Sequence, residues 1–205
     1  MKNTLLLLFL LLIFAQISIG QNTVSNKDTL QKNEFYSNEF KWRIIIPPGF
    51  LPQNAGQFEL YQKQGTEQLS KGLNTPINDR AKQICSFKYG KFGYFEVNEH
   101  AFDKTMFGDF LASCKNIENE FYEGFKNQIP ASVNLDTLHS TAGIDGLEFQ
   151  YFKLQMSIND KVLGNMLFYS KLFGNKEFSV IIIFADKESG DTMVNAWKGS
   201  KFNKN

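Results

Sequence analysis

The sequence reads Val180-Ile181-Ile182-Ile183-Phe184 toward its C-terminus, five consecutive apolar residues with no polar position between them. A strand with one face in water alternates apolar and polar residues, whereas a strand buried on both faces is apolar throughout. The stretch therefore predicts a central strand. Because both faces of the sheet around it must then be covered, we expect helices on each side of that sheet.

Two segments are expected to form those helices. Between residues 109 and 129, apolar residues recur every three or four positions and make one stripe, formed by Phe110, Cys114, Ile117, Phe121, Phe125 and Ile129. Asp109 is the expected N-cap of this helix, and Pro130 ends it. A closing helix is expected over residues 189–198. Residues 55–73 fit either a helix or a strand, since glycines interrupt both patterns.

The remainder of the chain predicts strands joined by tight turns. Asp145-Gly146 is a strong hairpin signal, and further turns are expected at Asn159-Asp160 and Gly174-Asn175. Between residues 147 and 158, the alternation of apolar and polar residues slips by one position at Tyr151-Phe152. One inserted residue would produce that slip, so we expect a β-bulge there.

The N-terminal residues have the three parts of a secretory signal peptide. Lys2 supplies the positive start, an apolar run extends from Leu5 to Ala15, and small residues precede Gly20. A membrane-spanning helix needs about 20 apolar residues, more than this run contains. We therefore expect cleavage after Gly20 and export to the periplasm or the outside of the cell, with no membrane span left afterwards. The alternative is a short uncleaved anchor.

The chain is expected to have three parts: a signal peptide over residues 1–20, a flexible lead-in over residues 21–38, and a single α+β domain over residues 39–205. The lead-in is polar and shows no hydrophobic period. A chain of this length buries enough surface for one core. The expected fold of the domain is a largely antiparallel, twisted β-sheet sandwiched between helices (α/β/α).

The charges of the chain are nearly balanced. It has 22 basic and 21 acidic residues, and the one surplus positive charge leaves with Lys2 when the signal is removed. A protein that binds a phosphate backbone needs a surplus of Lys and Arg. We therefore expect no nucleic-acid partner.

Motifs of the common enzyme classes are missing from the sequence. It contains no Gly-x-Ser-x-Gly nucleophile elbow, no Gly-x-x-x-x-Gly-Lys phosphate loop and no His-Glu-x-x-His zinc helix. Residues 186–191 hint at a calcium loop, but their spacing is wrong, so we expect a charged turn that caps the closing helix. With two histidines in all, a histidine-rich metal site cannot be assembled, so we expect no metal. We also expect no cofactor and no catalytic residue, and a monomer by default.

Two polar groups nevertheless contain catalytic residue types. The first follows a predicted strand and consists of Glu99, His100 and Asp103. A carboxylate beside a histidine can tune a general base, and the alternative is a solvated polar loop. The second has the residue types of a catalytic triad and consists of Asp136, His139 and Ser140. Neighbours in a strand point to opposite faces, so we interpret this second grouping as a coincidence.

The two cysteines of the chain, Cys85 and Cys114, are both expected to point inward. Cys85 lies in a predicted strand on the same face as Phe87, and Cys114 belongs to the apolar stripe of the long helix. An exported protein meets oxidising conditions, so a disulfide can form between them. The alternative is two buried thiols that pack as small apolar side chains.

The best candidate for a binding site is the segment Tyr89-Gly90-Lys91-Phe92-Gly93-Tyr94-Phe95. Its glycines leave the backbone open, and contact area is offered by its four aromatic residues, Tyr89, Phe92, Tyr94 and Phe95. Aromatic residues on loops favour recognition of a protein partner or a flat ligand. The alternative is that these residues belong to an aromatic-rich core.

Three segments together resemble the PsbP-like superfamily, whose members include the photosystem II extrinsic protein and a Ran-binding nuclear import factor. They are the opening Trp42-Arg43-Ile44-Ile45-Ile46-Pro47-Pro48-Gly49-Phe50, the hairpin Ile144-Asp145-Gly146, and the closing Ser200-Lys201-Phe202. The resemblance spans most of residues 40–202. It implies an α/β/α sandwich that binds partners, with no catalytic motif to transfer. The composition, rich in Asn, Lys, Ile and Phe, also resembles that of small exported proteins of Bacteroidetes.

The function expected from these patterns is that of a non-enzymatic exported module. Its ligand or partner would be an envelope protein or a small apolar molecule. The alternative is an unrecognised cell-envelope hydrolase, since a single sequence does not reveal an unfamiliar active site.

Overall fold

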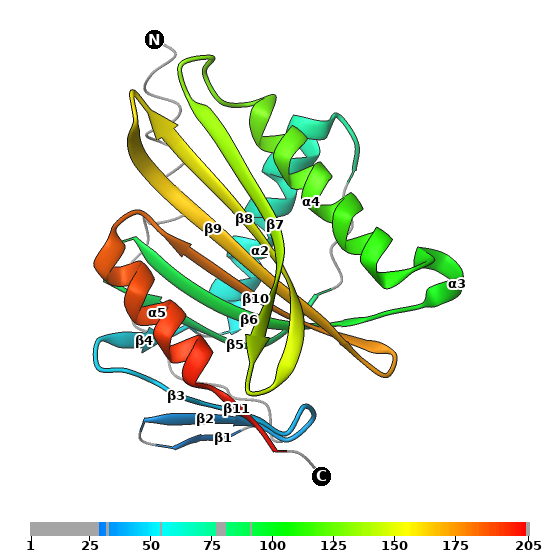
Figure 1. Ribbon diagram of the computed structural model, residues 1–205, viewed down its shortest axis with the longest axis vertical. Helices are drawn as coiled ribbons and strands as arrows, with labels where there is room; N and C mark the ends of the chain where they lie inside the picture. Colours follow the sequence, from blue (N-terminus) through cyan, green and yellow to red (C-terminus); the bar gives the residue numbers. More distant parts are fainter. Residues whose placement is uncertain (1–28, 32, 54, 77–80, 91, 204–205) are drawn as a thin grey trace.

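The computed structural model describes five stretches of the chain, which are residues 29–31, 33–53, 55–76, 81–90 and 92–203. The predicted signal peptide and the first part of the predicted lead-in lie outside these residues. The described part of the chain forms two antiparallel sheets and four helices (Figure 1). The α+β class expected from the sequence is confirmed.

The larger sheet has the strand order β4-β5-β6-β10-β9-β8-β7, and all neighbours are antiparallel. In chain order its strands are β4 (Phe50–Pro52), β5 (Lys82–Tyr89), β6 (Gly93–Ala101), β7 (Asn134–Ile144), β8 (Leu147–Ile158), β9 (Lys161–Phe173) and β10 (Lys176–Phe184). Tight turns join the last four strands in succession. The first of these turns is the predicted Asp145-Gly146, where φ is positive at both residues, as a type I′ hairpin requires.

The smaller sheet has the order β1-β2-β3-β11. Its strands are β1 (Thr29–Gln31), β2 (Glu34–Ser37), β3 (Trp42–Ile45) and β11 (Lys201–Phe202). The first two lie within residues 21–38, so the flexible lead-in predicted there is wrong for these strands. Phe35 anchors β2 in the core, where it is 3% exposed and its ring centroid lies 5.9 Å from that of Trp42. A single anchor in a polar stretch produces no hydrophobic period.

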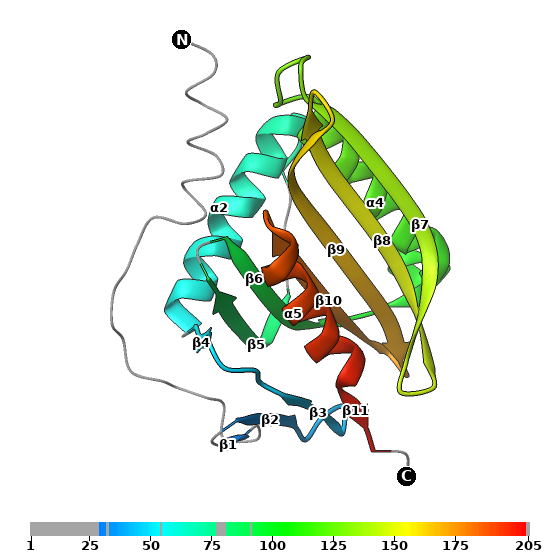
Figure 2. The same cartoon turned by 60° about the vertical axis from the view of Figure 1, so that its left-hand side comes forward.

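Both faces of the larger sheet are covered (Figure 2). Helices α2 (Ala55–Leu73) and α4 (Phe110–Lys126) lie on one face, and α5 (Lys187–Gly199) lies with the smaller sheet on the other. A short helix, α3 (Lys104–Phe107), precedes α4. The predicted sandwich is confirmed, and residues 55–73, which fitted either pattern, form a helix. None of the helices in the described residues is long and apolar enough to cross a membrane.

Strand β10 lies inside the larger sheet and contributes to both of its faces. Val180 and Ile182 are completely buried in the core on the α5 side. Ile181 and Ile183 alternate with them, so they point to the opposite face, where they are half-buried. This two-sided burial explains the unbroken apolar stretch and confirms the central strand that it predicts.

The β-bulge predicted at Tyr151-Phe152 is wrong. Strand β8 pairs through these residues without a break, and its register shift lies between Met156 and Ser157. Phe152 belongs to a second, smaller apolar cluster beneath α4, together with Val133, Leu154 and Met156. Tyr151 packs against the main core on the α5 side. The slip in alternation therefore arises because β8 contributes apolar side chains to the cores on both faces of the sheet, not because a residue is inserted.

Helices α2 and α4 approach each other closely at a pair of glycines. A Cβ atom placed on Gly72 would lie 2.3 Å from the backbone oxygen of Gly124, which cannot turn aside. Gly65, on the same helix as Gly72, has nothing within 4 Å of such an atom. The packing of the two helices thus requires glycine at position 72 but not at position 65.

We expect Gly72→Ala to lower the free energy of unfolding by about 1–3 kcal/mol, because overpacking forces the two backbones apart. Gly65→Ala is the matched control, and it should raise the same quantity by about 0.5–1 kcal/mol through better helix propensity. Urea denaturation of the two variants measures both values. Equal effects at the two positions would contradict the close contact.

Candidate functional site

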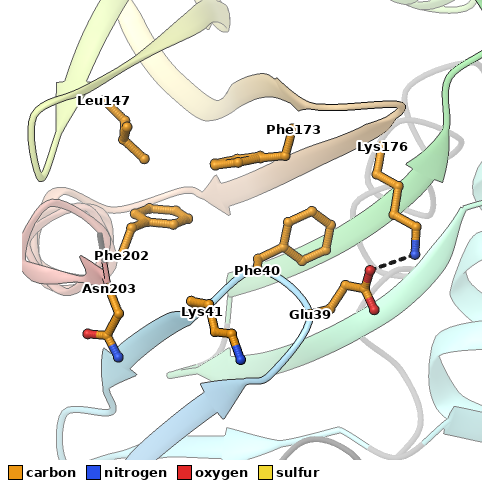
Figure 3. Close-up of a pocket in the computed structure, with 8 residues that line it drawn as sticks. All are labelled: Glu39, Phe40, Lys41, Leu147, Phe173, Lys176, Phe202 and Asn203. Atoms are coloured by element: carbon orange, nitrogen blue, oxygen red, sulfur yellow. Dashed lines mark hydrogen bonds and ion pairs between the residues drawn. The ribbon is translucent and has the colours of Figure 1, made fainter. Parts of the chain in front are cut away.

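A half-open cleft of about 280 Å³ lies at the junction of the two sheets (Figure 3). Its lining comes from the turn between β2 and β3, the start of β8, the turn between β9 and β10, and the C-terminal strand. The lining residues are Glu39, Phe40, Lys41, Leu147, Phe173, Lys176, Phe202 and Asn203. Turns far apart in the sequence thus form one site.

The cleft has an aromatic floor. Phe173 is stacked on Phe202 at 5.6 Å between ring centroids with an interplanar angle of 20°, and it meets Phe40 edge-on at 5.6 Å. Phe40 and Phe202 are 7% and 5% exposed, whereas Phe173 is half-buried. Figure 3 shows the three rings close together, with Leu147 beside them. They form one continuous apolar surface.

The rim of the cleft is polar. Lys176 Nζ lies 2.8 Å from Glu39 Oε1, and this hydrogen bond is the main reason that the pKa of Lys176 is raised. The lysine therefore stays protonated and is not a nucleophile at neutral pH. On the other side of the rim, the backbone N–H of Asn203 donates to the carbonyl of Lys41 at 2.8 Å. Each of these contacts joins two segments that are far apart in the sequence.

Asp145 fixes the C-terminal strand beside the cleft. Its carboxylate accepts a hydrogen bond from the backbone N–H of Phe202 at 2.9 Å and lies 3.1 Å from Nζ of Lys201. Because Asp145 belongs to the turn between β7 and β8, these contacts join β11 to the larger sheet. They hold the Phe202 ring in the floor of the cleft.

The aromatic segment predicted as a binding site lies elsewhere, on β5, β6 and the turn between them. Phe95 is completely buried in the main core. Tyr94 is 8% exposed, and its hydroxyl donates to the carboxylate of Glu96. Tyr89 and Phe92 are half-buried. Phe95 is a core residue, as the alternative interpretation expects, and none of the four aromatic residues of this segment lines the cleft.

The first polar group does not assemble into a site. Glu99 pairs with Lys82 at 2.7 Å, and Asp103 caps helix α3. Hydrogen bonds from Thr105 lower the pKa of Asp103, as an N-cap carboxylate requires. His100 is half-buried on β6. Each of the two acids thus has its own structural partner, and no cluster of three or more metal-binding side chains occurs among the described residues.

His139 has a partner that the sequence did not reveal. Its Nδ1 lies 2.5 Å from a carboxylate oxygen of Glu118 on α4. Burial raises the pKa of Glu118, and the bond to His139 acts in the opposite direction. Glu118 follows Cys114 by one helical turn, which is the signal that places it on the inward side of α4. The contact ties β7 to α4.

The two cysteines are buried and unbridged. Cys85 packs in the core on the α5 side of the larger sheet, whereas Cys114 lies on α4, which covers the opposite face. The sheet separates the two thiols, so the predicted disulfide is wrong and the alternative of two buried thiols is confirmed. Burial is the main reason that the pKa of Cys114 is raised from 9.0 to about 12. A thiol that stays protonated is a poor nucleophile.

The raised pKa of Cys114 should make stability fall at alkaline pH. Between pH 9.0 and about 12 the unfolded chain has lost this proton and the folded protein has kept it, so the unfolded state is favoured as pH rises. From pH 9 to 10 the free energy of unfolding should fall by about 1 kcal/mol because of this thiol. The Cys114→Ala variant should not show this fall. Urea denaturation at both pH values measures the difference. The same loss in the variant would show that other groups cause it.

No protein-family model and no curated protein matches the chain. Solved structures do match, among them the solution structure of cyanobacterial PsbP (CyanoP) from Synechocystis sp. PCC 6803. The two have a TM-score of 0.52 and 8% sequence identity, and the match covers 92% of this chain and 99% of that one. At so low an identity, the likeness concerns the fold alone. The sandwich described above, together with this match, shows that the chain has a PsbP-like fold.

Proposed function

We propose that this protein is an exported, non-enzymatic binding module whose cleft receives an apolar group of a ligand or partner. The aromatic floor of the cleft is the observation that carries the proposal. The three phenylalanine rings pack against one another at the half-open hollow. Phe173 is half-buried and offers most of the exposed ring surface, whereas Phe40 and Phe202 are largely buried. Apolar surface that remains open to water gains free energy when another apolar group covers it.

The size of the cleft limits what it can receive. Pockets for whole drug-sized molecules measure about 300–1,000 Å³, whereas this cleft measures about 280 Å³. It therefore suits one aromatic ring or one branched apolar side chain. A small apolar ligand fits this limit, and so does a protein partner that inserts a single large side chain.

The cleft is preformed, which favours binding. The pair of Lys176 and Glu39 fixes one side of the rim, and the backbone bond from Asn203 to Lys41 fixes the other. Lys41 has a φ of 51°, a turn conformation that this bond helps to hold. A site that is ordered before binding loses less conformational entropy when the ligand arrives.

The hydrolase alternative receives less support from the described residues. Lys176 is held in its protonated form at the cleft, and the Cys114 thiol is protonated on the opposite face of the sheet. His139 lies on β7 beside α4, not in the cleft. A nucleophile and a base therefore do not meet at the apolar floor.

Export is supported by the signal-like N-terminus and has a direct test. In its own organism the protein should occur in the periplasmic or secreted fraction, with Gln21 as its first residue, because signal peptidase cleaves after small residues. Native mass spectrometry of the purified protein measures the mature mass and any bound molecule together. A cytoplasmic chain that retains residues 1–20 would contradict export.

Binding at the cleft can be tested with the dye ANS, which can insert its single phenyl ring and whose fluorescence rises in apolar surroundings. We expect the wild-type protein to bind it and Phe173→Ser to bind it about tenfold more weakly, because one ring of the floor is lost. Leu51→Ser is the matched control, since Leu51 is 63% exposed on β4 and lies outside the cleft lining. Near-ultraviolet circular dichroism of the buried tryptophans checks that both variants are folded. Equal dye binding by all three proteins would refute the site.

A further inference from the structure

Strand β7 forms an edge of the larger sheet that is long, regular and exposed. It pairs with β8 through all 11 of its residues without a register shift. Eight of the 11 residues are exposed to solvent. The strand contains no Lys, no Arg and no Pro.

The other sheet edges of the described residues differ from it. β4, at the opposite edge of the larger sheet, has three residues and ends in Pro52. The edges of the smaller sheet, β1 and β11, have three and two residues. Proteins prevent unwanted strand pairing by shortening edge strands and by placing Pro, Lys or bulges on them. β7 has none of these protections.

The turn at the end of β7 determines which backbone groups face outward. In a type I′ hairpin the carbonyl of the first residue, here Ile144, accepts a bond from the N–H of the fourth, Leu147. Bonding then alternates along an antiparallel pair. The even-numbered residues of β7 therefore bond to β8, and the outward groups belong to Leu135, Thr137, His139, Thr141 and Gly143. One of them, the carbonyl of Thr141, accepts a weak bond from the Ser140 hydroxyl at 3.4 Å.

We propose that β7 pairs antiparallel with β7 of a second copy of this chain, which joins the two larger sheets into one. A two-fold axis perpendicular to the sheet at Leu138 brings outward groups of both strands into register. Leu138, which is 53% exposed, then faces Leu138 of the partner subunit. His139 faces Thr137 of the partner subunit, and Ser140 faces Asp136 of the partner subunit.

The charges of β7 favour this self-pairing. Its carboxylate is that of Asp136, and the strand has no basic residue except His139. In the register centred on Leu138, the two Asp136 residues lie four positions apart along the strand, about 14 Å. Each faces a serine hydroxyl that can donate to it. No like charges are directly opposed, and the exposed Leu138 becomes covered. The edge lies apart from the cleft floor, so the inference is independent of the proposed function.

Analytical ultracentrifugation of the purified mature protein tests the proposal. We expect a dimer that dissociates on dilution. Leu138→Glu should weaken dimerisation about tenfold or more, because two carboxylates would face each other. The variant should remain folded, since residue 138 lies opposite Lys153 on β8. Val162→Glu makes the same change at a 40% exposed residue of β9 and should leave the dimer unchanged.

Hydrogen exchange gives a second, residue-specific readout. The outward amides of Thr137, His139 and Thr141 should exchange slowly in concentrated protein and rapidly after dilution, while their even-numbered neighbours stay the same. A wild-type protein that remains a monomer at every concentration would overturn the proposal. So would a Leu138→Glu variant that dimerises as well as the wild type.

Discussion

The contact of Phe178 with two tryptophans fixes the two sheets relative to each other. Trp197 of α5 stacks on Phe178 at 6.2 Å, and Trp42 of β3 meets it edge-on at 5.3 Å. No described strand of one sheet pairs through its backbone with a strand of the other. Both indole N–H groups are buried without a hydrogen-bond partner among the described residues, which costs about 1–3 kcal/mol each. Burying a ring of this size contributes about 5 kcal/mol, so packing outweighs that cost.

The cleft is a consequence of the same aromatic packing. Phe202 and Phe40 contact Phe178 with ring centroids 5.5 Å and 4.9 Å apart. The floor of the cleft is therefore the outer edge of the core cluster. The hollow occurs where the β2–β3 turn and the C-terminal strand of the smaller sheet meet the β9–β10 turn and the start of β8 in the larger sheet. Its shape depends on how the two layers meet, not on any single loop.

Much of the fold could be predicted from the sequence, because buried faces of helices and strands produce regular patterns of apolar residues. The apolar run at 180–184 indicates that both faces of β10 are covered, and the apolar stripe of α4 indicates which face of that helix packs on the sheet. Strand β2 could not be predicted, because Phe35 is its one buried apolar residue. The cleft could not be predicted, since its rings come from positions as distant as Phe40 and Phe202. The aromatic segment ending at Phe95 has the composition of a binding loop, but in a chain with 15% aromatic residues many rings fill the core.

The same two-sided burial indicates where this protein can interact with others. A sheet with one free face can present that face to a partner, as many antiparallel sheets do. Here α2 and α4 cover one face, and α5 with the smaller sheet covers the other. Of the larger sheet itself, only the turns and the edge strands of the described residues remain open to solvent. Whether a strand is an edge depends on strand order, which no local sequence pattern encodes. Binding in such a fold should therefore concentrate at the turns around the cleft and along β7.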